Sequence, residues 1–230
     1  MRISLPALAA FVLSSGVSAQ DHLVPPDQDI LPTYHATLRR VLNEGYQPQV
    51  RARVLIVPSF RPERMIGLRQ KGEDFEIFSV SPTVHIWKYE IINSLKEGRI
   101  RVISGKTERD SITELEKDLP KYPTEVPLKR CEVSIDASMA KAIISAWLHM
   151  LNSVQEDKTG DIILDGTGYY FSMPVNGHEL VGEVSNPRTS SRTGKLVDLA
   201  YLKDEFCQTR RPKELRDLKR LGEEIISADE

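Results

Sequence analysis

The sequence lacks several features that would point to a particular chemistry. Its formal net charge is only −2 over 230 residues, so no overall basic field attracts nucleic acid or an anionic membrane surface. It has two cysteines and five histidines, and no two of the histidines form an HExxH or similar local pair. We therefore expect no zinc site, no cofactor and no nucleic-acid partner.

Motifs for phosphate binding and nucleophilic catalysis are also missing. Ile100 stands where a phosphate loop ending at Thr107 needs a glycine. Phe171 stands where a dinucleotide fingerprint needs its third glycine, and Ser59 lacks the flanking glycines of a serine-hydrolase elbow. No catalytic site can be read from a local motif, and any such site would have to be assembled from distant residues.

What is present begins with the first twenty residues, "MRISLPALAAFVLSSGVSAQ". Arg2 provides a positive charge, an apolar run of about a dozen residues follows, and small residues at Val17 and Ala19 suit a cleavage site. This run is shorter than the roughly 20 residues that cross a bilayer, and no later segment is long and apolar enough to do so. A buried N-terminal helix is the alternative. We expect a signal peptide over 1–19 and a periplasmic or secreted protein after cleavage near Ala19.

The two cysteines are interpreted in the light of this expected export. An oxidising compartment permits a bridge between Cys131 and Cys207, which would close a loop worth about 4 kcal/mol on the chain-entropy model. Two separate buried thiols and a catalytic thiol are the alternatives. No cysteine follows the expected cleavage site, so a lipid anchor is not indicated.

Hydrophobic periodicity predicts an α+β fold in which amphipathic helices pack on an antiparallel sheet of hairpins. The expected organisation is an extended lead-in over 20–32, one α+β domain over 33–209 whose halves meet at 120–127, and a charged C-terminal helix over 210–230. In the first half the pattern predicts a helix over 33–44, a strand over 51–60 and a short strand over 83–87. Between these strands, residues 65–80 are predicted to form two strands around a turn at 71–73, with apolar arms over 65–68 and 75–80. Apolar spacing of three over 88–97, a strand over 99–104 and a short helix from Ser111 complete this half.

The second half has the clearest periodicity. A strand over 131–135 leads to Asp136, a plausible N-cap, and to a helix with apolar residues at spacings of three and four up to Val154. Further helices are predicted over 195–207 and from Pro212 onward.

Between these helices, Asn176-Gly177 lies between alternating residues and predicts a type I′ hairpin. Its register would put five apolar or aromatic side chains on one face, and Pro174 would lie at an edge or a strand end. Asp165-Gly166 would make a second turn. The predicted pairs are Val175 with His178, Met173 with Leu180, Phe171 with Gly182, and Tyr169 with Val184.

Four residues are weak catalytic candidates, namely His85, His178, Asp165 and Glu183. A surface or structural role is the default for each of them, because carboxylates and histidines distant in sequence act together only if the fold joins them. A basic run over 210–220 could dock on an acidic partner, but its interspersed carboxylates favour a solvated helix face.

The stretch from Cys131 to Cys207, with "RCEVSI", "LDGTGYYFS", "GHELVGEVSNP" and a helix ending "DEFC", resembles a group of small exported bacterial proteins. These share a DGTxYxF strand and a cysteine in a terminal helix, and the chain departs from their pattern at Gly168 and Asn186. The resemblance implies a bacterial envelope location and a Cys131–Cys207 link. It implies no catalytic residue.

These observations favour a non-enzymatic binding or interaction protein of the bacterial envelope, with another protein as its partner. One concrete form is an inhibitor or immunity protein. The alternatives are a periplasmic hydrolase with a site assembled from sequence-distant residues and an envelope structural protein.

Overall fold

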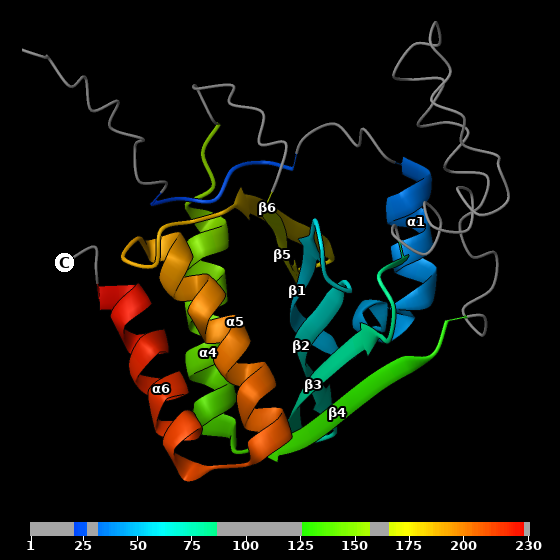
Figure 1. Ribbon diagram of the computed structural model, residues 1–230. Coiled ribbons are helices and arrows are strands. Elements are labelled where there is room, and N and C mark those ends of the chain that lie inside the picture. The colour runs from blue at the N-terminus through cyan, green and yellow to red at the C-terminus, as the bar shows by residue number, and fades with distance from the viewer. Residues whose placement is uncertain (1–20, 27–31, 87–125, 157–165, 228–230) are drawn as a thin grey trace, which may run out of the picture.

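The computed structural model describes residues 21–26, 32–86, 126–156 and 166–227 (Figure 1). Its centre is a six-stranded antiparallel sheet with the strand order β4-β3-β2-β1-β5-β6. The strands are β1 (Val50–Pro58), β2 (Arg64–Lys71), β3 (Asp74–Pro82), β4 (Leu128–Ile135), β5 (Thr167–Val175) and β6 (His178–Ser185). The predicted α+β class is confirmed.

Helices lie on both sides of this sheet (Figure 1). One face is covered by α4 (Ala137–Asn152), α5 (Arg192–Thr209) and α6 (Pro212–Ser227). The opposite face carries α1 (Pro32–Val41) and the short 3-10 helix η1 (Asn43–Tyr46). We call these two sides the α5 face and the α1 face of the sheet.

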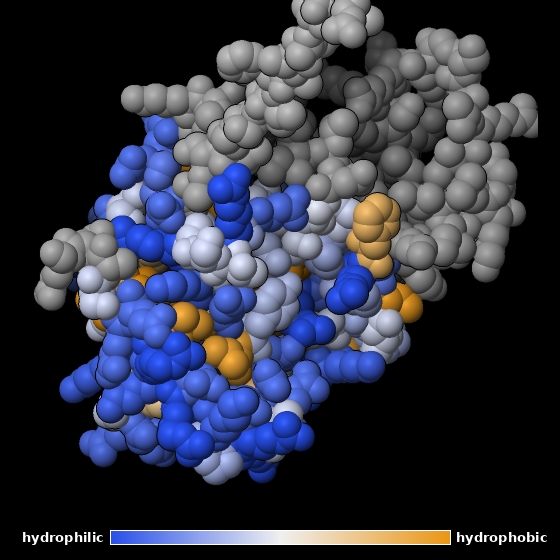
Figure 2. Space-filling view, turned by 60° about the vertical axis from the view of Figure 1, so that its left-hand side comes forward, coloured by the Kyte–Doolittle hydropathy of each residue, from blue (hydrophilic) through white to orange (hydrophobic). Residues whose placement is uncertain are grey.

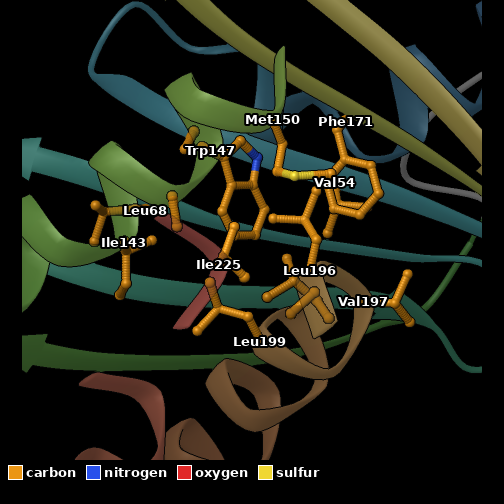
Figure 3. Close-up of a cluster of buried hydrophobic side chains, with 14 of the residues drawn as sticks. Val54, Leu68, Ile143, Trp147, Met150, Phe171, Leu196, Val197, Leu199 and Ile225 are labelled. Atoms are coloured by element: carbon orange, nitrogen blue, oxygen red, sulfur yellow. The ribbon is translucent and has the colours of Figure 1, made fainter. Parts of the chain in front are cut away.

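The main hydrophobic core fills the space between the sheet and the α5 face helices (Figure 3). Trp147 of α4 is fully buried, its ring meets Phe171 edge-on at a centroid distance of 5.5 Å, and its Nε1 donates to the Arg53 carbonyl at 3.3 Å. Alternate residues of β1, such as Val54, point into this core, as strand geometry requires. Leu218 and Ile225 bring α6 into the same cluster.

A smaller core lies on the α1 face. Leu38 and Leu42 from the first helical segment pack there with Phe78 and Val80 of β3 and with Met65 of β2. The sheet is therefore buried on both sides over its central strands, which explains the unbroken runs of buried residues at 65–69 in β2 and 76–80 in β3.

The hairpin of β5 and β6 forms in the predicted register, and all four predicted residue pairs are present. Asn176 and Gly177 both have positive φ, at 49° and 82°, as a type I′ turn requires. Pro174 lies beyond the part of β5 that pairs with β1, so it occupies the predicted strand-end position. The expected turn at Asp165 lies outside the described residues.

The predicted helices of the second half are confirmed, with one extension. Asp136 caps α4 by accepting a hydrogen bond from the Met139 backbone N–H at 2.8 Å, and this bond lowers the pKa of the Asp136 carboxyl. The α5 helix begins at Arg192, three residues earlier than expected, because Ser191 provides the N-cap and accepts from the Gly194 N–H at 3.0 Å.

The short strand expected over 83–87 is wrong for its described part, residues 83–86. The chain stays in β3 through Pro82, which pairs with Leu128, and then bends away from the sheet. The Thr83 N–H donates to the Pro127 carbonyl and the Ile86 N–H to the Glu63 carboxylate, so these donors are satisfied outside a ladder. The elements expected between 88 and 119 lie outside the described residues.

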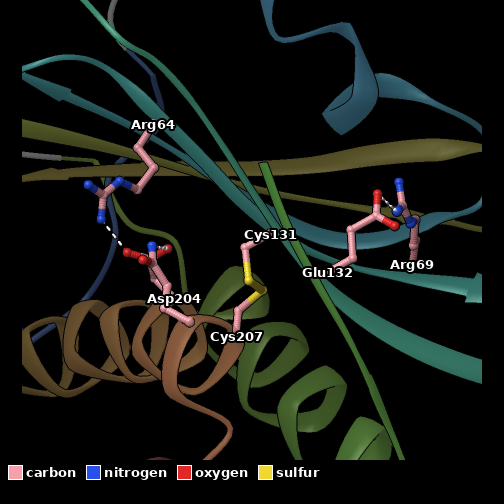
Figure 4. Close-up of a disulfide and its surroundings, with 7 residues drawn as sticks. Arg64, Arg69, Cys131, Glu132, Asp204 and Cys207 are labelled. Atoms are coloured by element: carbon pink, nitrogen blue, oxygen red, sulfur yellow. Dashed lines mark hydrogen bonds and ion pairs between the residues drawn. A yellow bond between two sulfur atoms is a disulfide. The ribbon is translucent and has the colours of Figure 1, made fainter. Parts of the chain in front are cut away.

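Cys131 and Cys207 form a disulfide, with their Cα atoms 5.9 Å apart (Figure 4). The bridge joins the edge strand β4 to the C-terminal part of α5. It also shows that the side chain of Cys131 points to the α5 face, which fixes the orientation of every other residue of β4.

Candidate ligand-binding groove

The structure places one of the four weak catalytic candidates, His85, in a buried polar cluster. Its Nε2 lies 3.4 Å from the Glu63 carboxylate, which is fully buried and also accepts from the Tyr34 hydroxyl at 2.5 Å. Because the same carboxylate holds the Ile86 backbone N–H, the cluster ties α1 and the end of β3 to the loop between β1 and β2. This arrangement has a structural role, since it fixes three segments to one another.

The other candidates do not join His85. His178 is exposed beside the hairpin turn, and Glu183 is half-buried on β6 with its backbone paired to Val24. β6 lies four strands from β3, whose end precedes His85, so these two strands are roughly 19 Å apart at the usual strand spacing. Asp165 lies outside the described residues. Within the described ranges, the fold assembles no catalytic cluster from these four residues.

Two further features are absent from the described ranges. No group of three or more histidine, cysteine, aspartate or glutamate side chains is arranged to hold a metal ion. No helix in these ranges combines the length and apolar character needed to cross a membrane.

A groove of about 1130 Å³ lies where the α5 face of the sheet extends beyond the helices. Its floor is made by the ends of β1, β3 and β4, and one wall is the C-terminal part of α5. The loop between β1 and β2 closes the other side, and the disulfide lies among the lining residues. Five separate stretches of sequence therefore meet in the groove, at residues 56–64, 79–83, 129–132, 166–167 and 201–210.

The lining of the groove is strongly cationic. It contains Arg61, Arg64, Lys129, Arg130 and Arg210 but one carboxylate, Glu132. Glu132 points to the α1 face, where it pairs with Arg69, and Arg130 likewise pairs with Glu44 there. Arg64 pairs with Asp204 of α5 (Figure 4). The remaining three cations are exposed and make no ion pair with any residue that the structure describes.

We call Arg61, Lys129 and Arg210 the groove cations. A chain with a net charge of −2 thus concentrates unpaired positive charge at one concave site. Concave sites lined by charge of one sign focus the electrostatic field and raise the local concentration of ligands of opposite sign. The chemistry that this lining can supply is the binding of anions.

Arg210 adopts a backbone conformation that a non-glycine residue seldom takes. It ends α5 in the left-handed region, at φ 55° and ψ 26°, where its N–H donates to the Phe206 carbonyl at 2.8 Å. Glycine is the usual residue at such a helix end because it lacks a Cβ. An arginine here costs conformational energy and places a guanidinium at the groove.

Two aromatic residues flank the cations. Phe60, at the tip of the loop between β1 and β2, is 77% exposed, and Tyr201 of α5 is 40% exposed. The Tyr201 hydroxyl lies 3.3 Å from that of Tyr169, and burial together with this contact raises the pKa of Tyr169. Exposed aromatic rings beside arginines are typical of recognition surfaces.

In the view of Figure 2, the described surface shows no broad apolar area that could serve as a docking site. On that side, which brings the helices forward, hydrophilic residues predominate and apolar side chains reach the surface in small, separate areas. Broad apolar patches mark many protein interfaces. This side therefore presents mainly hydrophilic side chains and no broad apolar patch.

A second charged residue of α5, Lys203, is fully buried behind the groove. Its Nζ lies 3.8 Å from the centroid of the Trp147 ring and has no hydrogen-bond partner among the described residues. Burial lowers the pKa of Lys203 to about 7. Lys203 does not line the groove, so it affects stability and not ligand contact.

The sequence patterns did not predict the groove, although one of its cations, Arg210, lies in the basic run over 210–220. The basic run over 210–220 divides in the structure, where Arg210 faces the groove and Arg220 pairs with Glu224 on α6. The other two groove cations gave no pattern, because they are single residues in a loop and at a strand start.

No protein-family model, no curated protein and no solved structure matches this chain.

Proposed function

We propose that the protein is an exported, non-enzymatic binding protein of the bacterial envelope and that its groove holds an anionic partner. The observation that carries the proposal is the set of three exposed groove cations, which have no counter-charge among the described residues. A protein that neutralises an envelope-targeted enzyme, as an inhibitor or immunity protein does, is the most concrete form of this function.

Export is supported by two features. The first nineteen residues have the charge and apolar pattern of a signal peptide. Disulfides form and persist in oxidising compartments, and Cys131–Cys207 lies directly at the proposed binding site. The bridge fixes β4 to α5 and so holds the floor and one wall of the groove in a constant geometry, which reduces the ordering cost of binding.

The test is a binding titration with defined polyanions. The chain from residue 20 is produced in a bacterial periplasm so that the disulfide forms, and poly-L-glutamate, inorganic polyphosphate and a heparin fragment are titrated at low and physiological salt. A variant in which all three groove cations become alanine is compared with the wild type. The matched control replaces three exposed cations of α6, namely Lys213, Arg216 and Lys219.

We expect the groove variant to bind the best of these polyanions roughly ten- to hundredfold more weakly, because three charge-assisted contacts are lost. The α6 variant has the same net charge and should bind within about threefold of the wild type. Binding should also weaken with added salt, as exposed charge pairs are screened. Equal weakening in both variants, or no binding to any polyanion, would contradict the proposal. Self-association without polyanion binding would instead favour an envelope structural protein.

A further inference from the structure

The edge strand β4 lies beside the groove, at one end of the sheet. It pairs with β3 from Leu128 to Ile135, and no described residue pairs with its other side. Its residues 129–132 line the groove in an unbroken run. An exposed strand edge presents backbone N–H and C=O groups to which an extended polypeptide can add as a further strand.

The side chains of β4 place positive charge on both sides of this edge. Lys129 shares the α5 face with Cys131, so it points into the groove that Arg210 also lines. Arg130 lies on the α1 face, next to Glu44. A strand added here would direct every second side chain into the groove, where acidic residues at alternate positions would meet Lys129 and Arg210.

The opposite edge of the same sheet already accepts an added segment. Val24 donates its backbone N–H to the Glu183 carbonyl at 2.9 Å and accepts from the Glu183 N–H at 2.8 Å, which makes an antiparallel bridge on β6. Val24 thus occupies one position along that edge. The pairing shows that this twisted sheet can take a further backbone segment at an edge.

We propose that the partner is an acidic polypeptide segment that adds in extended form to the outer edge of β4 and places alternate carboxylates in the groove. The inference rests on the proposed function and names the chemical class of its ligand. Backbone hydrogen bonds to β4 supply affinity, and the groove cations select acidic side chains.

Charge distinguishes this partner from a second copy of the chain. Exposed cations on an edge strand oppose its pairing with an identical edge, because like charges then approach one another. The same cations attract an acidic strand. Polyphosphate or a sulfated glycan would satisfy the cations as well, but neither would use the backbone donors and acceptors of β4.

The test compares two peptides with identical side chains. One is a hexapeptide in which glutamate alternates with threonine, and the other carries N-methyl groups on alternate backbone nitrogens and cannot complete a ladder. Affinity is measured by titration, and amide hydrogen exchange is followed along β4 and β6 of the whole chain. Polyphosphate serves as an anion without a peptide backbone.

We expect the unmodified hexapeptide to bind at least tenfold tighter than the N-methylated one. It should slow the exchange of those β4 amides that do not bond to β3, and leave the β6 amides unchanged. In a Lys129→Glu variant, binding of the glutamate peptide should fall at least tenfold, while an otherwise identical lysine peptide should gain affinity.

Three outcomes would overturn the inference. Equal binding of the N-methylated peptide, with polyphosphate also bound, would show that the groove holds anions without strand addition, so the proposed function would stand alone. Slow exchange of the outer β4 amides in the ligand-free protein would show that the edge is already occupied. Failure of both peptides and of polyphosphate to bind would remove the proposed function as well.

Discussion

Val24 pairs with Glu183 along the outer edge of β6, whereas the outer edge of β4 pairs with no residue that the structure describes. The two edges are also held differently, since β6 continues the hairpin from β5 and β4 is tied to α5 by Cys131–Cys207. Unpaired strand edges are usually covered or charged, because they attract other chains. One edge here carries a bridge from the same chain. The other is tied to α5, carries cations and pairs with no residue in the described ranges.

Removal of the disulfide should have the largest effect on the difference between the β4 and β6 edges. The Cys131→Ala, Cys207→Ala double variant should lose about 4 kcal/mol of unfolding free energy, because a loop with a sequence separation of 76 is no longer closed. Chemical denaturation measures the loss. Native-state amide exchange should show β4 opening before β6. A loss below about 1 kcal/mol, or equal opening of both edges, would mean that the bridge does not hold the β4 edge.

Lys203 of α5 is a buried lysine, and its burial lowers the stability of the folded protein. Lys203→Met keeps the volume and the contact with Trp147 but removes the need to bury an ammonium. We expect a gain of about 2 to 4 kcal/mol at pH 7, which is the cost of the lowered pKa less the lost cation–π attraction. Denaturant unfolding measures it, and an unchanged or lower stability would contradict the assignment.

The same lysine predicts a pH dependence with a definite sign. Its pKa is about 7 in the folded protein and near 10.5 when unfolded, so the unfolded chain binds more protons between these values. Stability should therefore be highest near the unfolded pKa and fall as the pH drops toward 7, by about 2 kcal/mol from pH 9 to pH 7. Lys203→Met should lose this slope. A slope that survives in the variant would assign it to other groups.

At the other edge, Val24→Pro should open the covered side of β6. Proline has no N–H to donate to the Glu183 carbonyl, and one lost hydrogen bond costs about 1 kcal/mol. Val24→Ala retains the donor and is the matched control. Faster exchange of the β6 amides in the proline variant alone is the expected result, and equal effects of both variants would assign the stabilisation to the Val24 side chain.

The variant with the smallest expected effect on stability, Arg210→Gly, separates folding from binding at the groove. Arg210→Gly relieves the left-handed backbone of the α5 terminus and should stabilise the protein by about 1 kcal/mol. It should nevertheless weaken polyanion binding severalfold. Higher thermal stability with lower affinity is the expected combination, and unchanged affinity would remove Arg210 from the groove cations.

The sequence was enough to predict those elements whose determining interactions are local. The Asn176-Gly177 turn and the alternation around it fixed the register of β5 with β6, and Asp136 marked the start of α4. Over residues 83–86 the expected strand is wrong because the Glu63 carboxylate, more than twenty residues earlier, holds the Ile86 N–H away from the sheet. A local pattern cannot contain that contact.

The groove could not be predicted for the same physical reason. Arg61, Lys129 and Arg210 come from three distant segments that only the β4-β3-β2-β1 order and the α5 packing bring together. Lys203 did leave a signal, because it stands four residues before Cys207 on the buried face of α5. A lysine at a position where the periodicity of a helix predicts a core residue indicates an unusual buried charge.

The central claim is that the unpaired cations of the groove, and not the general charge of the chain, bind the partner. The most direct test is the ratio of dissociation constants for poly-L-glutamate between the groove-cation triple variant and the equally charged α6 triple variant. We predict a ratio of at least ten, with the wild type close to the α6 variant. A ratio near one would contradict it.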